Sequence, residues 1–525
     1  MQTKRLAGCG CVSRVQTGAR TMTKGWPDVT EPCDLSAVEA RALIGAKKLS
    51  ARDLLESCLK RIDAVDPAVN AMVARDDERA RKAALEADEK TARGEALGAL
   101  HGLPLGVKDL EEVAGLRTTF GSELFANHVP DKDQLIVANT RAAGAIVVGK
   151  TNTPEWGAGA NTRNAVYGAT GNPFDPSKSA AGSSGGSGVA LATGMVPLAT
   201  GSDTGGSLRN PAAFNGIVGF RPTPGLVPSD KRPLGWNPLS VLGPMARNVP
   251  DLCLLLSTMV GDDGVDPLST TIHGRQVRRP EDFARPDRID LASLKVAVTP
   301  DFGFAPTENH IREVFADKVG RFSNLFGAVE ETTPDCTGAD ETFEILRAVG
   351  FLAGLYEKVR DTPEKIGPNV RANVEEGLRY NALDVTRALK QQTVIYQNWQ
   401  RFFGQYDVVL SPAVCISPRD WSELFPAEID GRPTRTYFHW LACAYAVTNV
   451  GHPAISVPVG LDRNGMPFGL QIVGPRGGDA KVLAVAAALE TALAGDPLTA
   501  RPVPDIAKLA AGPKIADAPN FMGFG

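Results

Sequence analysis

The sequence predicts an α/β protein with a largely buried sheet. Short β-branched runs between glycines, at 105–107 and 145–148, alternate with helical stretches such as 134–143. The chain of 525 residues has 43% hydrophobic and 22% charged residues, which excludes wholesale disorder, collagen-like repeats and coiled coil. Because it has no internal repeat and no long linker, we expect one continuous domain with helical decoration rather than three separate domains.

The hydrophobic pattern places the elements in order along this domain. Residues 35 to about 94 are predicted to be helical: Ser50 is a candidate N-cap, Asp53 stands at the third helical position, and Pro67 is expected to end that helix. The stretch 262–289, rich in Asp, Arg and Pro, is expected to be a surface excursion. The remaining expected elements are strands at 294–298, 408–410 and 454–457, and helices at 308–326, 341–403 and 481–494.

Charge, hydropathy and cysteine content exclude several classes of function. Lys and Arg number 56 against 60 Asp and Glu, so the chain has no positive excess for a nucleic-acid backbone and we expect no nucleic-acid partner. No stretch approaches the roughly 18 to 20 apolar residues of a membrane span. The eight cysteines are scattered, and the pair Cys9 and Cys11 lacks a second pair or a nearby histidine. We therefore expect no metal, no cofactor, and reduced thiols in a cytoplasmic protein.

The N-terminal residues, 1–24, are expected to be a disordered extension or the product of a start assigned upstream of Met22. The first 22 residues contain four basic residues and no acid, which is superficially similar to a targeting segment. Only five residues precede Leu6-Ala7-Gly8-Cys9, whereas a secretory signal needs an apolar region of about 7 to 15 residues before its cleavage site.

The most unusual segment is rich in glycine and serine and spans 179–188, before a helix-compatible stretch. A phosphate-binding loop would need a lysine after the glycines, and none follows. The stretch Gly182-Ser183-Ser184-Gly185-Gly186 matches the G-x-S-x-G elbow of α/β-hydrolases, with Ser184 in the place of the nucleophile, but no buried strand precedes it directly. A flexible linker does not usually run into a helix and then into a second glycine turn.

That second turn, at 200–209, places Ser207 where its own loop can supply oxyanion donors. A serine nucleophile needs a base, and none of the six histidines lies in a recognisable triad motif. A lysine can serve if burial lowers its pKa, and Lys108, which closes a short apolar strand, is the best candidate. An ordinary surface lysine is the alternative interpretation. Ser57 and Lys60 have the serine–lysine spacing of penicillin-binding proteins, but they lie mid-helix without the partner motif.

Taken together, these segments resemble the signature of the amidase signature family over roughly residues 34 to 495. The Lys, Ser, Ser order and spacing of the family is matched by Lys108, Ser183 and Ser207. The motifs that carry the resemblance are Gly106-Val107-Lys108-Asp109, Gly182-Ser183-Ser184-Gly185-Gly186-Ser187, Gly201-Ser202-Asp203-Thr204-Gly205-Gly206-Ser207-Leu208-Arg209, Gly216-Ile217-Val218-Gly219-Phe220-Arg221, Gly451-His452-Pro453-Ala454 and Gly469-Leu470-Gln471.

The resemblance implies one large α/β/α domain, with a mixed, twisted central sheet flanked by helices, and a Ser-Ser-Lys triad. Ser207 would be the nucleophile, neutral Lys108 the base and later the acid, and Ser183 the bridge between them, with a cis peptide bond before Ser183. The backbone N–H groups of Thr204, Gly205, Gly206 and Ser207 would form the oxyanion hole. Asp203, Arg209 and Ser184 are expected to support this loop rather than react.

Within a domain at 25–505, the resemblance implies four parts and a tail. The parts are N-terminal helices at about 34–95, a catalytic core at about 100–260, a variable substrate-pocket region at about 261–450 and a return to the core at about 451–495, with the tail at 506–525. Six aromatic residues of the variable region are candidates for an apolar acyl site, although core packing explains each equally well: Phe351, Tyr356, Trp421, Phe425, Tyr437 and Trp440.

The expected activity is hydrolysis of a small-molecule amide through an acyl-enzyme on Ser207, with esters or carbamates as side substrates. The alternative within the family is the catalytic subunit of a glutamine-dependent aminoacyl-tRNA amidotransferase, and a non-enzymatic scaffold is the alternative of another class. The sequence leaves the amide and the oligomeric state open, a homo-oligomer included.

Overall fold

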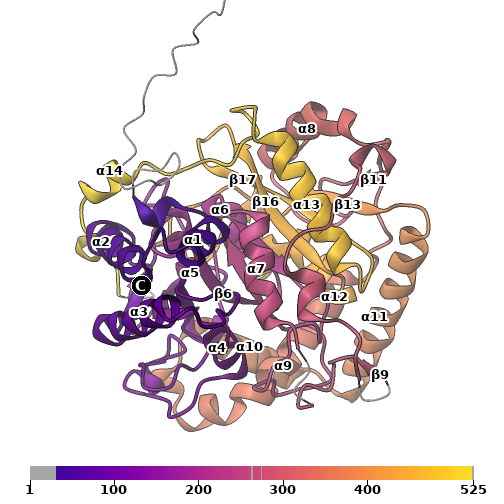
Figure 1. The fold of residues 1–525 in the computed structure, drawn as a ribbon. Helices are drawn as coiled ribbons and strands as arrows, with labels where there is room; N and C mark the ends of the chain where they lie inside the picture. The colour runs from indigo at the N-terminus through magenta and orange to yellow at the C-terminus, as the bar shows by residue number, and fades with distance from the viewer. Residues whose placement is uncertain (1–30, 262–263, 273–274, 523–525) are drawn as a thin grey trace, which may run out of the picture.

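The centre of the molecule is an eleven-stranded mixed sheet, as expected (Figure 1). The computed structural model describes residues 31–261, 264–272 and 275–522. The strands, in their order across the sheet, are β1 (Met72–Arg75), β3 (Ile146–Thr151), β2 (Pro104–Lys108), β6 (Leu198–Asp203), β8 (Val241–Ala246), β7 (Val218–Arg221), β16 (Ala454–Leu461), β17 (Pro467–Val473), β13 (Val408–Pro412), β11 (Lys295–Val298) and β12 (Ala328–Glu331).

Strand directions divide this sheet into three regions. Strands β3, β2 and β6 run parallel to one another, as do β13, β11 and β12. The strands between these groups, from β6 to β13, and the edge strand β1 pair antiparallel. The antiparallel strands at the centre join the two groups of parallel strands, so segments far apart in the chain meet in one sheet.

Helices cover both faces of the sheet and form a three-layer domain. Their bounds are α1 (Ala37–Gly45), α2 (Ala51–Val69), α3 (Asp77–Ala92), α4 (Leu135–Ala142), α5 (Gly185–Ala192), α6 (Arg209–Asn215), α7 (Val249–Met259), α8 (Asn309–Phe322), α9 (Ala339–Asp361), α10 (Pro368–Arg379), α11 (Ala382–Phe403), α12 (Ala442–Val450), α13 (Asp479–Leu493) and α14 (Ile506–Ala510).

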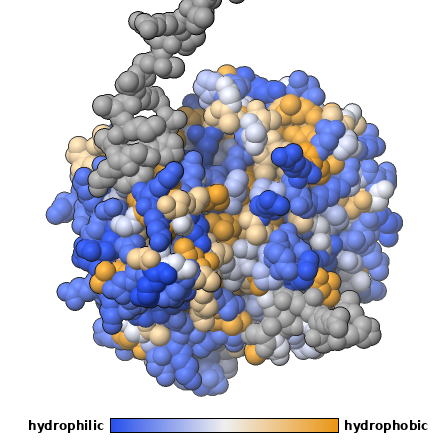
Figure 2. Space-filling view, viewed as in Figure 1, coloured by the Kyte–Doolittle hydropathy of each residue, from blue (hydrophilic) through white to orange (hydrophobic). Residues whose placement is uncertain are grey.

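The two faces have separate hydrophobic cores. On one face, α1, α4, α7, α8 and α13 bury their apolar side chains against the sheet; Figure 1 shows α7 and α13 in front of it. On the other face, α5 and α6 pack directly on the strands, with α2 and α3 at one end and the group α9 to α12 at the other. Figure 2 shows a mostly hydrophilic outer surface with small, separate apolar groups, as is usual for folded domains.

Two sequence-based expectations about the N-terminal helices were wrong. Helix α2 does not end at Pro67 but continues to Val69, because a proline in the last turn removes only one backbone bond and Asn70 then ends the helix with a left-handed φ of 54°. The stretch expected to be helical throughout contains β1, which pairs with β3 at the edge of the sheet. Tertiary pairing overrides local propensity in so short a strand.

Three parts of the chain were expected to lie outside the regular core: the N-terminal residues, the segment 262–289 and the C-terminal tail. Residues 1–24, and with them the pair Cys9 and Cys11, lie outside the described residues. In the part expected as a tail, α14 packs against α2 through the buried side chain of Leu509. The segment 262–289 is described in part, and its 3-10 turn Pro280–Phe283 packs against α7. The stretch 341–403 forms the successive helices α9, α10 and α11.

Candidate active site

Lys108 ends β2, a strand buried along its whole length between β3 and β6. Its side chain is fully buried, and its Nζ atom lies 2.7 Å from Ser183 Oγ, 2.9 Å from Ser184 Oγ and 2.9 Å from Ser202 Oγ. A neutral amine has two N–H donors and one lone pair, so it can donate to two of these hydroxyls and accept from the third. The surroundings suit a lysine that holds and releases a proton.

Burial lowers the pKa of Lys108 to about 7, although the negative charges of Glu111 and Asp203 act to raise it. No carboxylate forms an ion pair with this ammonium group among the described residues. Desolvation therefore dominates over charge attraction, and a neutral amine is accessible near neutral pH. The alternative of an ordinary surface lysine is wrong, since Lys108 is 0% exposed.

Ser183 lies in a loop that leads into α5. The peptide bond between Gly182 and Ser183 is cis, and Ser184 is the residue before the helix. A Cβ atom on Gly182 would come within 2.9 Å of the backbone at Ala160, so only glycine fits there. The close packing of this loop holds Ser183 and Ser184 against Lys108.

Ser207 lies in the turn between β6 and α6. The amide of Ser184 donates to the carbonyl of Ser207 (3.3 Å), which joins this turn to the Ser183 loop. The Ser207 side chain is partly exposed, and its hydroxyl has no hydrogen-bond partner within 31–261, 264–272 and 275–522. The structure therefore brings Lys108 and Ser183 into direct contact and places Ser207 on the adjoining loop, without a direct bond from Ser207 to Ser183.

The backbone of this turn requires glycine at two positions. Gly206 has a φ of 116°, and a Cβ atom on Gly205 would lie 2.9 Å from the ring of Phe343. The Gly206 amide donates to Asp203 Oδ1 (2.9 Å), which differs from the expectation that it faces an oxyanion, because a buried carboxylate is a strong acceptor. The amides of Thr204, Gly205 and Ser207 are the remaining candidate donors.

Asp203 and two arginines fix the shape of the turn. Arg209 contacts both carboxylate oxygens of Asp203 at 3.0 Å, and Arg221 Nη1 lies 3.1 Å from Oδ1, with all three side chains fully buried. Although burial alone would raise it, Arg209 and Arg221 hold the pKa of Asp203 well below its usual range. Arg209 also donates to Gln471 Oε1 (2.5 Å) of β17, which ties the turn to the C-terminal core.

A buried polar group behind Lys108 was not predicted from the sequence. Glu111 is 1% exposed, accepts a hydrogen bond from Thr200 Oγ1, and leaves its Oε1 without a partner. Thr200 Oγ1 also accepts from the backbone amide of Lys108 (3.0 Å), and burial raises the pKa of Glu111. Its position in the sequence, a charged residue three positions after a predicted buried strand, was the only sign that a buried carboxyl group lies there.

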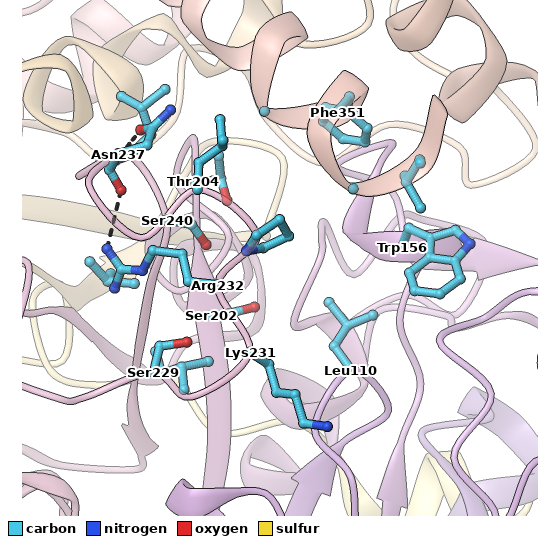
Figure 3. A pocket seen from close by; sticks show the side chains of 18 of the residues that line it. Leu110, Trp156, Ser202, Thr204, Ser229, Lys231, Arg232, Asn237, Ser240 and Phe351 are labelled. Carbon is cyan, nitrogen blue, oxygen red and sulfur yellow. Dashed lines mark hydrogen bonds between the residues drawn. The ribbon is translucent and has the colours of Figure 1, made fainter. Parts of the chain in front are cut away.

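A cavity of about 440 Å³ opens beside the turn that carries Ser207 and reaches Ser202 and Thr204. Figure 3 shows its two sides: Leu110, Trp156 and Phe351 form an apolar wall, and Ser202, Ser229, Ser240 and Arg232 form a polar wall opposite. Arg232 donates to the carbonyl of Asn237 (3.1 Å).

The six aromatic residues proposed for the acyl site separate into three groups. Phe351 lines the cavity. Trp421, Tyr437 and Trp440 are buried in hydrophobic clusters, Phe425 packs against one of them, and Tyr356 is 38% exposed. Core packing therefore accounts for Trp421, Phe425, Tyr437 and Trp440.

Two kinds of feature are absent from the described residues. No group of three or more His, Cys, Asp or Glu side chains is arranged to hold a metal ion in the part of the chain that the structure describes. None of the described helices is both long enough and apolar enough to cross a bilayer.

Comparison with known proteins shows which family the chain matches. The family model described as Amidase matches residues 53–483. An acylamidase from Rhodococcus erythropolis is 34% identical over 459 residues, which is 87% of this chain and 95% of that protein. A glutamyl-tRNA(Gln) amidotransferase subunit from Alkaliphilus metalliredigens is 32% identical, covering 88% and 96%. The structure of a bacterial aryl acylamidase of the amidase signature enzymes superposes with a TM-score of 0.80 at 26% identity, covering 91% of this chain and 98% of that one.

Proposed function

Since the chain belongs to the amidase signature family, we propose that it hydrolyses carboxylic amides through an acyl-enzyme on Ser207, with Ser183 and Lys108 as the proton relay. The observation that carries this proposal is the position of Lys108, fully buried with its Nζ atom 2.7 Å from Ser183 Oγ. A buried amine that titrates near neutral pH is what general acid–base catalysis needs at physiological pH.

The first half of the reaction forms an ester. Ser207 Oγ attacks the amide carbon while its proton passes through the Ser183 hydroxyl to neutral Lys108. The carbonyl oxygen becomes negative and is stabilised by the amides of Thr204, Gly205 and Ser207, and removal of one such donor typically costs about 3 to 4 kcal/mol of barrier. Lys108 then returns the proton to the leaving nitrogen, the C–N bond breaks, and the amine departs.

The second half reverses the relay with water in place of the serine. A water molecule gives its proton through Ser183 to Lys108 as its oxygen attacks the ester carbon, and the proton then returns to Ser207 Oγ as the acid leaves. The same groups thus act twice, first as base and then as acid. Ser184 and Ser202, the other two neighbours of the amine, orient it for both steps.

The test is to label the nucleophile and follow turnover in one set of proteins. Wild type, Ser207→Ala and the control Ser177→Ala, which changes an exposed serine bonded to Asp175, are treated with a fluorophosphonate and measured by intact mass. We expect one adduct on wild type and on the control and none on Ser207→Ala, with circular dichroism unchanged. Amide turnover by Ser207→Ala at the wild-type rate would exclude Ser207 as the nucleophile.

The amidotransferase role is the second candidate, because glutamyl-tRNA(Gln) amidotransferase subunits are among the relatives. The purified chain alone distinguishes the two roles. Hydrolysis of simple amides without partner proteins supports the stand-alone hydrolase, whereas activity only with added partner proteins and glutamine supports the amidotransferase.

We also propose the cytoplasm as the compartment. The cysteines carry this proposal: the six described ones are buried and none forms a disulfide, although the Sγ atoms of Cys415 and Cys443 lie 3.6 Å apart. Thiol titration of the freshly purified, denatured protein tests it, because reduced cysteines throughout are expected.

A further inference from the structure

One face of α9 forms a wall of the cavity beside the catalytic turn. The residues that line the cavity from this helix come from successive turns: Leu346, Arg347, Gly350, Phe351, Gly354 and Leu355. Their spacing places them on one side of the helix, with the two glycines one turn apart. We call this side the glycine face of α9.

Two glycines in the interior of a long helix destabilise it, and such glycines usually occur where a neighbouring group packs too closely for a side chain. No group packs that closely against Gly350 or Gly354. A Cβ atom on Gly350 would have nothing within 4 Å, and one on Gly354 would meet only Pro233 Cγ at 3.5 Å, an ordinary contact. A side chain at either position therefore fits without a clash and takes up space in the cavity itself.

A cationic group at the same face is already covered by aromatic rings. Arg347 is 6% exposed, forms no ion pair with any described residue, and donates only through Nη1, to Asn373 Oδ1. Its guanidinium group lies over three aromatic rings, at 4.6 Å from the ring centre of Phe351, 4.8 Å from that of Tyr437 and 4.3 Å from that of Phe438. Cation–π contacts of this kind stabilise the guanidinium group and hold it beside Phe351 at the wall of the cavity.

We propose that the glycine face of α9 is a binding subsite for an aryl group of the substrate, and that the missing side chains of Gly350 and Gly354 set the size of group accepted. The inference rests on the proposed function, because the cavity matters for catalysis only if the neighbouring turn acts on an amide. A flat ring would lie on the two glycines, beside the apolar wall formed by Leu110, Trp156 and Phe351.

The test narrows the cavity by one methyl group at a time. Gly350→Ala and Gly354→Ala add a Cβ atom on the glycine face. Gly320→Ala is the matched control, because Gly320 also lies inside a helix, α8, has nothing within 4 Å of an added Cβ, and lies outside the cavity. Alanine favours a helix over glycine, so all three variants are expected to keep or raise Tm, which separates a change in specificity from a loss of fold.

Four amides test the acyl side and the amine side of the substrate separately, because a ring is present on neither side, on one side or on both. They are acetamide, benzamide, acetanilide and benzanilide. One methylene in an apolar pocket typically changes kcat/KM by about 10- to 200-fold. We expect either glycine variant to lower kcat/KM by about tenfold or more for the aryl amides that use the subsite, and to leave acetamide within about twofold. The control is expected to leave all four unchanged. Loss on benzamide places the acyl group on the glycine face, and loss on acetanilide places the amine there.

Two results would overturn the inference while leaving the proposed function intact. One is that wild type hydrolyses the amides and that both glycine variants keep its ratio of kcat/KM for the aryl amides to kcat/KM for acetamide. The other is an equal loss on all four amides in those variants, which would mean that the catalytic turn had been disturbed. Wild-type protein that neither hydrolyses any of the four nor takes a fluorophosphonate on Ser207 would overturn the proposed function, and the subsite with it.

Discussion

Acylation of Ser207 is expected to depend on pH through Lys108. Burial lowers the pKa of this lysine to about 7, and only its neutral form accepts the proton of the nucleophile. At about pH 5, two units below that value, about 1% of the amine is neutral, whereas at about pH 9 nearly all of it is. The rate is therefore expected to fall about a hundredfold across this range, with half of the maximum near pH 7.

The assay is the rate of fluorophosphonate labelling, read by intact mass at each pH. This measures the first chemical step and avoids product release, which often limits turnover. Lys108→Ala is the matched variant. Its labelling is expected to be slow at every pH and to lose the dependence on pH, because water then has to take the proton in place of the lysine. Circular dichroism at each pH confirms that the fold persists.

Two results would refute this reasoning. A flat labelling rate from about pH 5 to about pH 9 would mean that no neutral amine is needed. Labelling of Lys108→Ala at close to the wild-type rate would remove Lys108 from the relay even if the pH profile had the expected shape, because the slope would then belong to another group.

Two further predictions concern the groups around this lysine. Glu111→Gln is expected to move the acid limb of the labelling profile to lower pH, because the charge of Glu111 raises the pKa of Lys108; an unchanged limb would mean that Glu111 carries no charge in that range. Arg209→Met leaves the buried Asp203 with one arginine, and is expected to lower the free energy of unfolding in urea by about 3 to 5 kcal/mol, as loss of one partner of a buried ion pair does. The control Arg321→Met, in an exposed pair with Asp317, is expected to lower it far less, because surface ion pairs contribute little; similar losses in both variants would contradict the role given to Arg209.

The sequence predicted the parts of the site that depend on local chain geometry. The glycines at 182, 205 and 206 are needed because a side chain there meets backbone at Ala160, the ring of Phe343, or the side chains of Asn210 and Ala444, and such positions are visible as glycine-rich turns. The end of the apolar run before Lys108 likewise marked a buried strand. The mixed sheet and the order of lysine and serines came from resemblance to a family, since no local rule gives an eleven-stranded topology.

Features that depend on distant parts of the chain were not accessible in this way. β1 is a strand because β3 lies beside it, and Phe351 was separated from the other five aromatic residues only by the position of α9. The two glycines of α9 had no turn signal and no visible partner in the sequence. Their open surroundings are a property of the cavity, which is formed by segments more than a hundred residues apart.

The ion cluster at Asp203 links the shape of the turn that carries Ser207 to the protonation state of Lys108. Asp203 acts to raise the pKa of Lys108, and a bare carboxylate at this depth would favour the ammonium form, which is inactive as a base. Arg209 and Arg221 balance that charge, and the same contacts hold the turn in place. Replacement of either arginine is therefore expected to affect more than stability. In Arg209→Met the acid limb of the labelling profile should move to higher pH, a change that a purely structural role would not produce.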